Sequence, residues 1–392
     1  MIVRFYLKMA SAQKGKALQL QLYDGVAAIA QPAWPAGEGA GVFVGREWLA
    51  ALEETGCVGG ETGWRPLPLA LERDGRTVGL APAYLKQHNR GEYVFDWSWS
   101  EAYVRAGLDY YPKLVVASPF TPVTGSRLLG GADEQAHLIA GLQQLVDDNG
   151  LSSAHVLFPT VDEASRLREA GWLLRDGVQF HWRNRAYADF DDFLATLSRD
   201  KRKKIRQERR KVADVGVTVR ALAGGDIAAA DWELFFRCYR QTYLEHGSLP
   251  YLNLEFFRRI GERLPGHCVM FIASREGRDI AASLCVRDGD ALYGRYWGAL
   301  EEVPCLHFEL CYYQGLEYAI RQGLGTFEGG AQGEHKQARG FEPERTVSAH
   351  YIADPRFRSA IADWLRRERE GVAGYVDQLF SHSAYKTLAR DV

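Results

Sequence analysis

The chain has 392 residues, of which 46% are hydrophobic and 25% charged, and its formal net charge is -2. This composition is typical of a globular protein with two or three domains, and it gives no overall attraction to DNA or to an anionic membrane. No apolar run approaches the roughly 18 residues of a membrane span, and the six cysteines include no Cys-x-x-Cys pair. We therefore expect reduced thiols, no metal site, no membrane insertion and a cytoplasmic location.

The first strong structural signal is a β-hairpin at residues 69–80, in which apolar and polar residues alternate around an Asp-Gly turn. The pattern recurs 202 residues later, at residues 271–282. Each copy is followed by a helix that stops at a glycine and then by a strand, within residues 136–158 and 308–328. A period of this length predicts that one α/β unit has been duplicated.

Residues 84–125 form an aromatic insert in the first copy. Aromatic side chains bury large areas in cores, but prolines and polar residues interrupt any regular period here, as in the wall of a cleft. The pattern supports both interpretations equally. In a cleft, the substrate-binding candidates are Asp96, Trp97, Tyr111, Lys113 and Thr121.

The second copy opens with a strongly basic helix. Eight basic residues and one acid fall within residues 201–211, while Ile205 and Val212 keep a thin apolar stripe. A solvated helix face would show the same composition, but so many like charges repel one another unless an anion offsets them. We predict binding of phosphate groups, from a nucleotide-linked substrate or from tRNA. The candidate residues are Lys201, Arg202, Lys204, Arg206 and Arg209.

Residues 327–341 combine four glycines with the side chains that acyl transfer needs. A strand that ends here would deliver polar groups to the edge of a sheet, and glycines let backbone N–H groups approach a ligand. Open α/β sheets bind ligands at such strand ends, which favours a site over an ordinary solvated loop. The candidates are Glu328, Gly329, Gly330, Gln332, His335, Lys336 and Arg339, with Tyr296, Trp297, His307 and Glu309 upstream.

Several segments carry a resemblance to a known family: Gly91–Trp97, Tyr111–Leu114, Pro119–Gly125, Gly177–Trp182, Arg295–Gly298 and Gly329–Gly340. Through them the chain, from about Leu18 to its end, resembles bacterial proteins described as predicted N-acyltransferases of peptidoglycan biosynthesis or recognition, within the Fem-like branch of the N-acyltransferase superfamily. The resemblance implies an α/β (α+β) fold of two tandem GNAT-like domains, each a mixed sheet flanked by helices. The central strands of each sheet would splay apart to admit an acyl donor.

The resemblance also assigns positions. Gly329-Gly330 stand where Fem ligases close a central strand with Gly-Gly, and Lys336 and Gly340-Phe341 stand where they have a lysine followed by Gly-Phe. His335 departs from the pattern, because the ligases place an aromatic residue beside that lysine. In Fem ligases the donor is an aminoacyl-tRNA and the acceptor is an amine on a cell-wall precursor peptide.

Acyl-CoA is the alternative donor. Ordinary GNAT enzymes hold its pyrophosphate on a Gln/Arg-x-x-Gly-x-Gly/Ala loop at a helix N-terminus, and Arg127–Ala132 fits that short pattern. In either case we expect the donor to be a co-substrate and no cofactor to be tightly bound.

Transfer of an acyl group to an amine needs stabilisation of an oxyanion and a proton acceptor. We expect Lys336 and Arg339 to stabilise the oxyanion or a donor phosphate, and Glu328 or His335 to accept the proton. The function predicted is thus a Fem-like N-acyltransferase or aminoacyltransferase that acts on a small-molecule or peptide amine. A non-catalytic module that binds a peptidoglycan precursor or nucleotide-sugar is the alternative.

These expectations divide the chain into four parts. An N-terminal extension covers residues 1–17, a first domain residues 18–186, a second domain residues 187–353, and a pair of capping helices residues 354–392.

Overall fold

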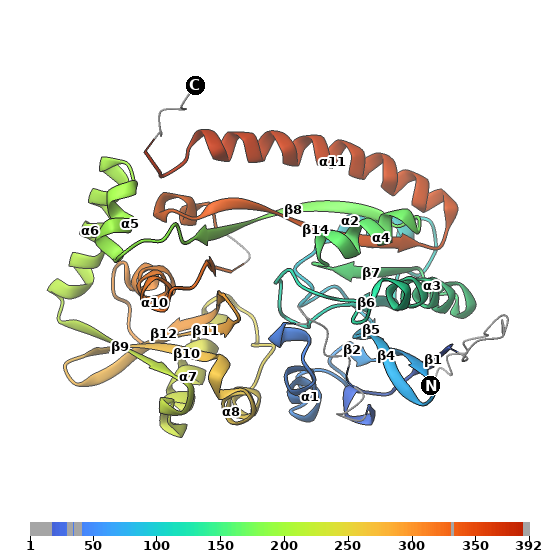
Figure 1. The fold of residues 1–392 in the computed structure, drawn as a ribbon, viewed down its shortest axis with the longest axis horizontal. Coiled ribbons are helices and arrows are strands. Elements are labelled where there is room, and N and C mark those ends of the chain that lie inside the picture. The colour runs from blue at the N-terminus through green and yellow to red at the C-terminus, as the bar shows by residue number, and fades with distance from the viewer. Residues whose placement is uncertain (1–17, 30–33, 35–40, 331–332, 387–392) are drawn as a thin grey trace. The chain divides into compact units, whose positions relative to one another are not determined.

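The computed structural model describes residues 18–29, 34, 41–330 and 333–386, so the predicted N-terminal extension lies outside it. The chain divides into two compact units, each discontinuous in sequence (Figure 1). Unit 1 comprises residues 1–177 and 345–373, and unit 2 comprises residues 178–344 and 374–392.

Unit 1 contains two groups of strands. One is a three-stranded sheet in the order β1-β3-β4, and the other has the order β2-β5-β6-β7-β14. All neighbouring strands are antiparallel except β6 and β7, which run parallel. Their bounds are β1 (Leu18–Leu22), β2 (Trp64–Pro66), β3 (Leu69–Arg73), β4 (Arg76–Ala81), β5 (Ala83–Lys86), β6 (Lys113–Val116), β7 (Ser153–Leu157) and β14 (Glu342–Ile352).

The main helix of unit 1 is α3 (Ala132–Asn149), which packs on β3, β4 and β7. Two acidic residues lie in its first turn, where the helix dipole favours them, and Gly150 ends it in the left-handed conformation. Leucine and valine side chains of α3 and the strands form one continuous core. The other helices of unit 1 are α1 (Arg46–Glu54), α2 (Trp97–Arg105) and α4 (Val161–Glu169).

Unit 2 has a single sheet in the order β9-β10-β11-β12-β13-β8. Its neighbouring strands are antiparallel except β12 and β13, which are parallel. The bounds are β8 (Leu173–Arg183), β9 (Val217–Ala223), β10 (Cys268–Arg275), β11 (Arg278–Asp288), β12 (Ala291–Ala299) and β13 (Thr326–Glu328).

Helices cover both faces of this sheet. Figure 1 shows α7 (Ala229–Glu245) and α8 (Leu254–Arg263) on one face and α10 (Gln314–Arg321) on the other. The α7 backbone lies so close to β12 that a Cβ on Gly298 would stand 1.9 Å from the carbonyl oxygen of Cys238. Other helical segments of unit 2 include α5 (Phe190–Thr196), α6 (Arg199–Asp214), α9 (Leu306–Phe308), a π-helix η6 (Glu309–Tyr313) and a 3-10 helix η7 (Glu334–Arg339).

The predicted repeat is present in the structure. The two hairpins form as β3-β4 and β10-β11, with turns at Asp74-Gly75 and Glu276-Gly277. The helix and strand that follow each hairpin are α3 with β7 in unit 1 and α10 with β13 in unit 2. In unit 1, Pro82 separates β4 from β5, which together correspond to the continuous β11. Each unit takes its last strand from a distant part of the chain: β14 pairs with β7, and β8 pairs with β13.

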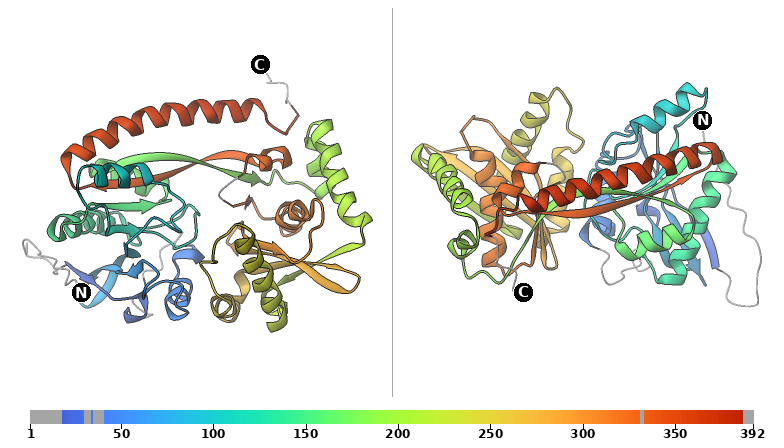
Figure 2. Two further views of the ribbon diagram at one scale, coloured as in Figure 1. Left: turned by 180° about the vertical axis from the view of Figure 1, so that it is seen from behind. Right: turned by 90° about the horizontal axis from the view of Figure 1, so that it is seen from above.

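The C-terminal segment differs from the prediction. Instead of a pair of capping helices, residues 355–381 form one continuous helix, α11 (Pro355–Ser381), which Figure 2 shows without interruption. The sequence there contains two glycines, Gly371 and Gly374, but a glycine inside a helix costs only about 1 kcal/mol relative to alanine. That cost is too small to break a helix that buries Ile361 and Leu365.

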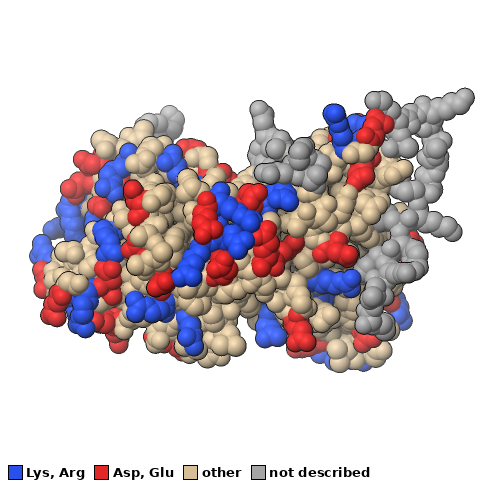
Figure 3. All heavy atoms as spheres, turned by 90° about the horizontal axis from the view of Figure 1, so that it is seen from below, with Lys and Arg blue, Asp and Glu red and all other residues tan. Residues whose placement is uncertain are grey.

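The surface carries charges of both signs. On the face in Figure 3, basic and acidic side chains are interspersed, in keeping with the formal net charge of -2. Among the described residues, no helix combines the length and hydrophobicity needed to cross a bilayer. Within the same ranges, no group of three or more His, Cys, Asp or Glu side chains could hold a metal ion.

Candidate functional site

The candidate site of unit 2 begins where two parallel strands part. β12 pairs with β13 only from Ala291 to Tyr293, opposite Thr326 to Glu328. β13 then ends, and Gly329 and Gly330 follow, while β12 continues to Ala299 in contact with β11. From Gly294 onward, the side of β12 that faced β13 is therefore open.

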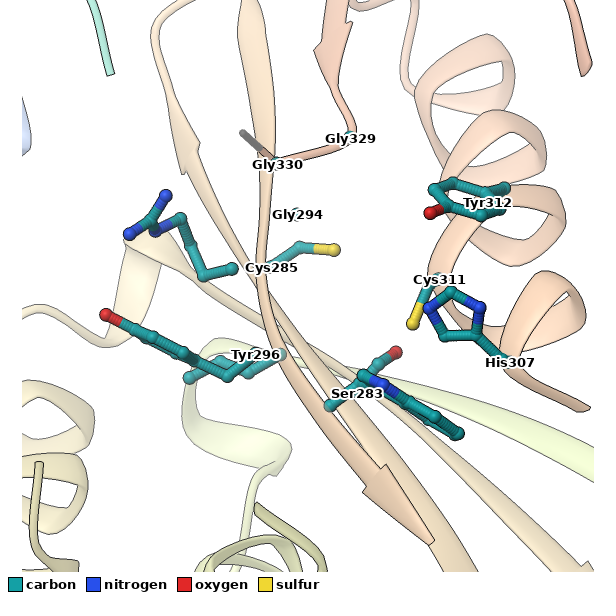
Figure 4. A pocket seen from close by; sticks show the side chains of 12 residues that line it. Ser283, Cys285, Gly294, Tyr296, His307, Cys311, Tyr312, Gly329 and Gly330 are labelled. Atoms are coloured by element: carbon teal, nitrogen blue, oxygen red, sulfur yellow. The ribbon is translucent and has the colours of Figure 1, made fainter. Parts of the chain in front are cut away.

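A pocket of about 100 Å³ fills this opening (Figure 4). Predicted site residues Tyr296, Trp297, His307, Gly329 and Gly330 all line it. The pocket has seven further lining residues, none of them among the predicted site residues: Ser283, Leu284, Cys285, Gly294, Arg295, Cys311 and Tyr312.

Two backbone irregularities shape this pocket. The β11–β12 ladder shifts register between Leu284 and Cys285, so that Arg295 becomes an extra residue in β12. On the opposite wall the helix widens into the π-helix η6, and in Figure 4 the side chains of Cys311 and His307 extend from the helix toward β12. Bulges and π-helical turns occur often at functional sites, because they re-aim side chains that a regular element would direct elsewhere.

Lys336 lies directly behind the glycine loop. It is only 1% exposed, and its Nζ donates a hydrogen bond to the carbonyl oxygen of Gly330 at 2.6 Å. A Cβ on Gly329 would lie 3.0 Å from the Cε1 of Phe341 and 3.4 Å from the Cδ of Lys336, so the glycine lets the loop pass close to both side chains. Burial lowers the pKa of Lys336 to about 8.

Glu328 precedes the two glycines at the end of β13. Burial raises the pKa of its carboxyl to about 7, against the opposing effect of Arg295 and Arg183. Its Oε2 lies 3.7 Å from the Nε2 of His181, the residue opposite it on β8. A carboxyl with a pKa near neutrality can both accept and release a proton under ordinary conditions.

Two histidines flank the pocket. The ring of His307 lies 4.6 Å from that of Trp297, and burial lowers its pKa to about 4, so the imidazole is neutral at pH 7. His335 is exposed on η7, and its Nε2 lies 2.8 Å from the hydroxyl of Tyr312. Burial also lowers the pKa of His335.

Arg339 is buried behind the pocket wall, and protein groups hold its guanidinium. It forms an ion pair with Glu208 at 2.8 Å and donates to the hydroxyl of Tyr313 and to the carbonyl oxygen of His335. Its predicted contact with substrate therefore stays a prediction. Gln332 lies outside the described residues.

The predicted basic helix is α6. Its apolar stripe is confirmed, because Ile205 and Val212 are buried while Lys204 and Arg206 are exposed and Lys201 and Arg202 half-buried. Arg206 pairs with Asp191 at 3.0 Å at the surface. Phosphate binding by this helix stays a prediction.

Arg209 and Glu309 lie at a second, shallower hollow of about 460 Å³ beside α6. Arg209 pairs with Glu309 at 3.0 Å and with Glu317 at 2.7 Å. Glu309 is thus anchored to α6 rather than directed into the pocket between β12 and β13, and its predicted substrate contact stays a prediction.

The candidates from the aromatic insert belong to unit 1 and do not line the pocket of unit 2. Lys113 is fully buried, and its Nζ donates to Glu92 at 2.8 Å and to Asp96. Burial alone would lower the pKa of Lys113, but the two carboxylates raise it above its ordinary value. Tyr110 donates to Asp96 at 2.6 Å, and Glu92 and Asp96 each keep one buried oxygen without a partner among the described residues.

The rest of the insert is divided between core and surface. Tyr84, Trp99, Tyr103 and Tyr110 are buried, as is Thr121, whose hydroxyl donates to the carbonyl oxygen of Pro119 at 3.0 Å. Tyr111 is half-buried, with Lys113 Nζ 5.7 Å from its ring centre. Trp97 is 58% exposed. Most of the insert is therefore core, and Trp97 and its neighbour Phe95 are its exposed aromatic part.

The loop at residues 127–132, which fits the CoA pattern, binds a carboxylate from the same unit of the protein. The backbone N–H groups of Arg127 and Leu128 both donate to the carboxylate of Glu163, at 2.8 Å each. Glu163 also completes the N-terminal cap of α4, where it accepts from the backbone N–H of Thr160 at 3.0 Å. The side chain of Arg127 is buried and donates to the carbonyl oxygen of Leu157 at 2.8 Å.

The corresponding loop of unit 2 connects β12 to α9 and is acidic. It contains Glu301 and Glu302, and Glu301 pairs with Arg275 at 2.5 Å. Both loops thus carry or bind a carboxylate, whereas pyrophosphate binding needs N–H groups and positive charge.

The fold and the sequence both have known relatives. FemX, a solved structure, superimposes with a TM-score of 0.50 at 13% sequence identity, over 81% of this chain and 93% of FemX. A conserved protein of unknown function from Bacteroides thetaiotaomicron VPI-5482 has a TM-score of 0.51 at 9% identity, over 86% of this chain and 100% of that one. At such low identity the superpositions show a shared fold alone. This likeness confirms the predicted fold class, in which mixed sheets are flanked by helices.

No curated protein matches the sequence. The sequence does match one family, FemAB-like, described as peptidoglycan biosynthesis/recognition, over residues 25–387. Since this match covers nearly the whole chain, the protein belongs to the FemAB-like family.

Proposed function

We propose that this protein is a Fem-like N-acyltransferase that moves an acyl group from an activated donor to an amine of a peptidoglycan precursor. Membership of the FemAB-like family supports the transferase class and the peptidoglycan connection at a coarse level. The observation that carries the proposal is the pocket between β12 and β13, where the glycine loop is hydrogen-bonded to a buried lysine.

The pocket supports a direct transfer. The amine nitrogen attacks the acyl carbonyl carbon, a C–N bond forms, and the bond from that carbon to the donor oxygen or sulfur breaks. The oxyanion that develops needs a nearby positive charge, which we assign to Lys336. Glu328, with its pKa near 7, is the proposed acceptor of the proton that the amine loses. The leaving group takes up a proton from the solvent.

The two connecting loops favour aminoacyl-tRNA over acyl-CoA as the donor. In unit 1 the carboxylate of Glu163 accepts from the N–H groups of Arg127 and Leu128, and in unit 2 the loop is acidic, so both loops hold negative charge that opposes a pyrophosphate. By contrast, α6 offers a row of cations that suits a nucleic-acid backbone. The side of β12 that extends beyond its pairing with β13 is the proposed place for the acyl end of the donor, because an extended ligand can pair with the edge of a strand.

The test is a transfer assay with purified protein and a UDP-linked muramoyl pentapeptide. One arm receives tRNA charged with a mixture of amino acids and the other receives short acyl-CoAs, and mass spectrometry reads the mass added to the peptide. We expect an aminoacyl adduct in the tRNA arm alone. An adduct in the CoA arm alone would refute the donor assignment. Tight binding of the muropeptide without any adduct would favour the binding module instead.

A further inference from the structure

The one acidic residue within residues 201–211 points inward. Glu208 lies in the middle of α6, between the buried Ile205 and Val212, and is only 7% exposed. Its neighbours Arg206, Gln207 and Arg210 are exposed. A carboxylate is costly to bury unless charged partners and hydrogen bonds compensate it. Glu208 therefore needs charged or hydrogen-bonding partners in the surrounding structure.

Glu208 is held by two groups from different elements, η7 and the π-helix η6. The Nη2 of Arg339, on η7, donates to both carboxylate oxygens of Glu208, at 2.8 and 2.9 Å. The hydroxyl of Tyr313, the last residue of the π-helix η6, donates to the same carboxylate. Tyr313 and Arg339 also contact each other, because the Nε of Arg339 donates to the tyrosine hydroxyl at 3.0 Å.

Arg339 also contacts the segment that carries Lys336. Its Nη1 donates to the carbonyl oxygen of His335 at 2.6 Å, and its guanidinium lies 3.6 Å from the ring centre of Phe308. Lys336 is the next residue after His335 in the same short helix. The hydrogen bond from Arg339 to His335 thus links the end of the 3-10 helix to its start. Lys336, between them, donates to the carbonyl oxygen of Gly330.

From this geometry we infer that Glu208 is a positioning residue, which fixes the loop of Lys336 and the π-helix relative to each other and so sets the geometry of the transfer site. The inference rests on the proposed function. It assigns α6 a second role, since the helix that displays cations outward also joins η7 to the π-helix η6 through Glu208.

The buried ion pair between Glu208 and Arg339 should be sensitive to the loss of either charge. Removing the charge of Glu208 would leave Arg339 buried without its counter-ion, and breaking a buried pair in this way strongly perturbs the groups around it. A displacement of about 1 Å at a reacting group can cost about 10²-fold in rate. Loss of Glu208 should therefore loosen η7 and let water reach Lys336.

The experiment compares Glu208→Gln with a control, Asp191→Asn, which removes the acidic partner of an exposed ion pair between α5 and α6. Transfer is assayed with the donor found for the wild type. We expect Glu208→Gln to lower kcat about 10- to 100-fold with little change in KM, and Asp191→Asn to leave both unchanged. Since Glu208→Gln could fail to fold, Tyr313→Phe, which removes only the bridging hydroxyl, is measured as well and should lower kcat in the same direction.

A second readout does not depend on catalysis. With lysine selectively labelled with ¹³C, the Cε resonance of Lys336, assigned with Lys336→Arg, is followed through a pH titration. Because burial is what lowers the pKa of Lys336, we expect Glu208→Gln and Tyr313→Phe to raise it from about 8 toward its ordinary value of 10.5. Wild-type kcat and a wild-type Lys336 titration in the folded variants would overturn the inference. If the wild type transfers nothing from any donor, the proposed function fails, while the titration still decides whether Glu208 positions the lysine.

Discussion

The Nζ of Lys336 and the carbonyl oxygen of Gly330 are 2.6 Å apart, so the lysine proposed to stabilise the oxyanion is bound to the loop that lines the pocket. Replacement by methionine keeps the length of the side chain but removes the charge. We expect Lys336→Met to reduce transfer about 10²- to 10³-fold, the usual effect of losing one oxyanion donor.

Acceptor binding, measured by calorimetry with the muropeptide, should survive this change. The exposed Lys386→Met is the control and should keep wild-type activity. Full activity in Lys336→Met would remove the lysine from the mechanism.

The two titrating groups beside the pocket predict a bell-shaped pH dependence. Below pH 7 Glu328 becomes protonated and cannot accept the amine proton, and above pH 8 Lys336 loses its charge. We therefore expect kcat/KM to be highest between about pH 7 and pH 8. In Glu328→Gln the remaining activity should no longer fall as the pH drops below 7. A wild-type profile that is flat from about pH 6 to pH 9 would contradict the roles given to both Glu328 and Lys336.

The buried lysine of unit 1 should be important for stability. Lys113→Met would leave Glu92 and Asp96 buried without their counter-ion, a change that typically costs about 3 to 5 kcal/mol. Urea unfolding at pH 7 measures the loss. Arg105→Met is the control, because its partner Glu101 is 4.0 Å away and both side chains are exposed, and its effect should stay within about 0.5 kcal/mol. Equal midpoints for the two variants would show that the buried cluster contributes nothing.

Gly298 is predicted to tolerate no side chain. A Cβ there would meet the Cys238 carbonyl at 1.9 Å and the Thr242 hydroxyl at 2.8 Å, so α7 would have to move away from β12. We expect Gly298→Ala to lower the melting temperature by several degrees or to prevent folding, since overpacking costs typically about 1 to 3 kcal/mol or more. Gly225→Ala, with nothing within 4 Å of the new methyl group, should leave the melting temperature unchanged.

The outward face of α6 predicts a salt dependence. If Lys201, Lys204 and Arg206 contact tRNA phosphates, changing all three to glutamine should weaken tRNA binding and reduce the slope of log K against log salt by about 2 to 3. Filter binding between low and physiological salt measures the slope. An unchanged slope would mean that the helix is a solvated face.

Much of the fold could be predicted from local pattern. The hairpins at residues 69–80 and 271–282 follow from apolar alternation around turn residues, and the helices after them end at glycines that suit the left-handed conformation. These signals depend on neighbours in the sequence. The stripe of Ile205 and Val212 is of the same kind, because a helix repeats its faces within a few residues.

The site was predicted less completely because its parts come from distant segments. Cys285 and Cys311 looked like ordinary core thiols, and only the pairing of β11 with β12 and the widened turn of the π-helix bring both to the pocket wall. In the sequence, Glu208 is a single acidic residue among basic ones, and nothing near it indicates a buried ion pair. Its partner Arg339 is 131 residues away. No local pattern reveals such a pair.

The exchange of final strands makes neither half of this protein self-sufficient. A polypeptide that stopped at residue 186 would hold β7 without β14, and the complementary fragment would hold β13 without β8. Each fragment would present an unpaired edge strand, the feature that promotes aggregation most directly. Because each half lacks a strand that its sheet pairs with, the two halves must be made as one polypeptide, and separate expression of either half should give insoluble material.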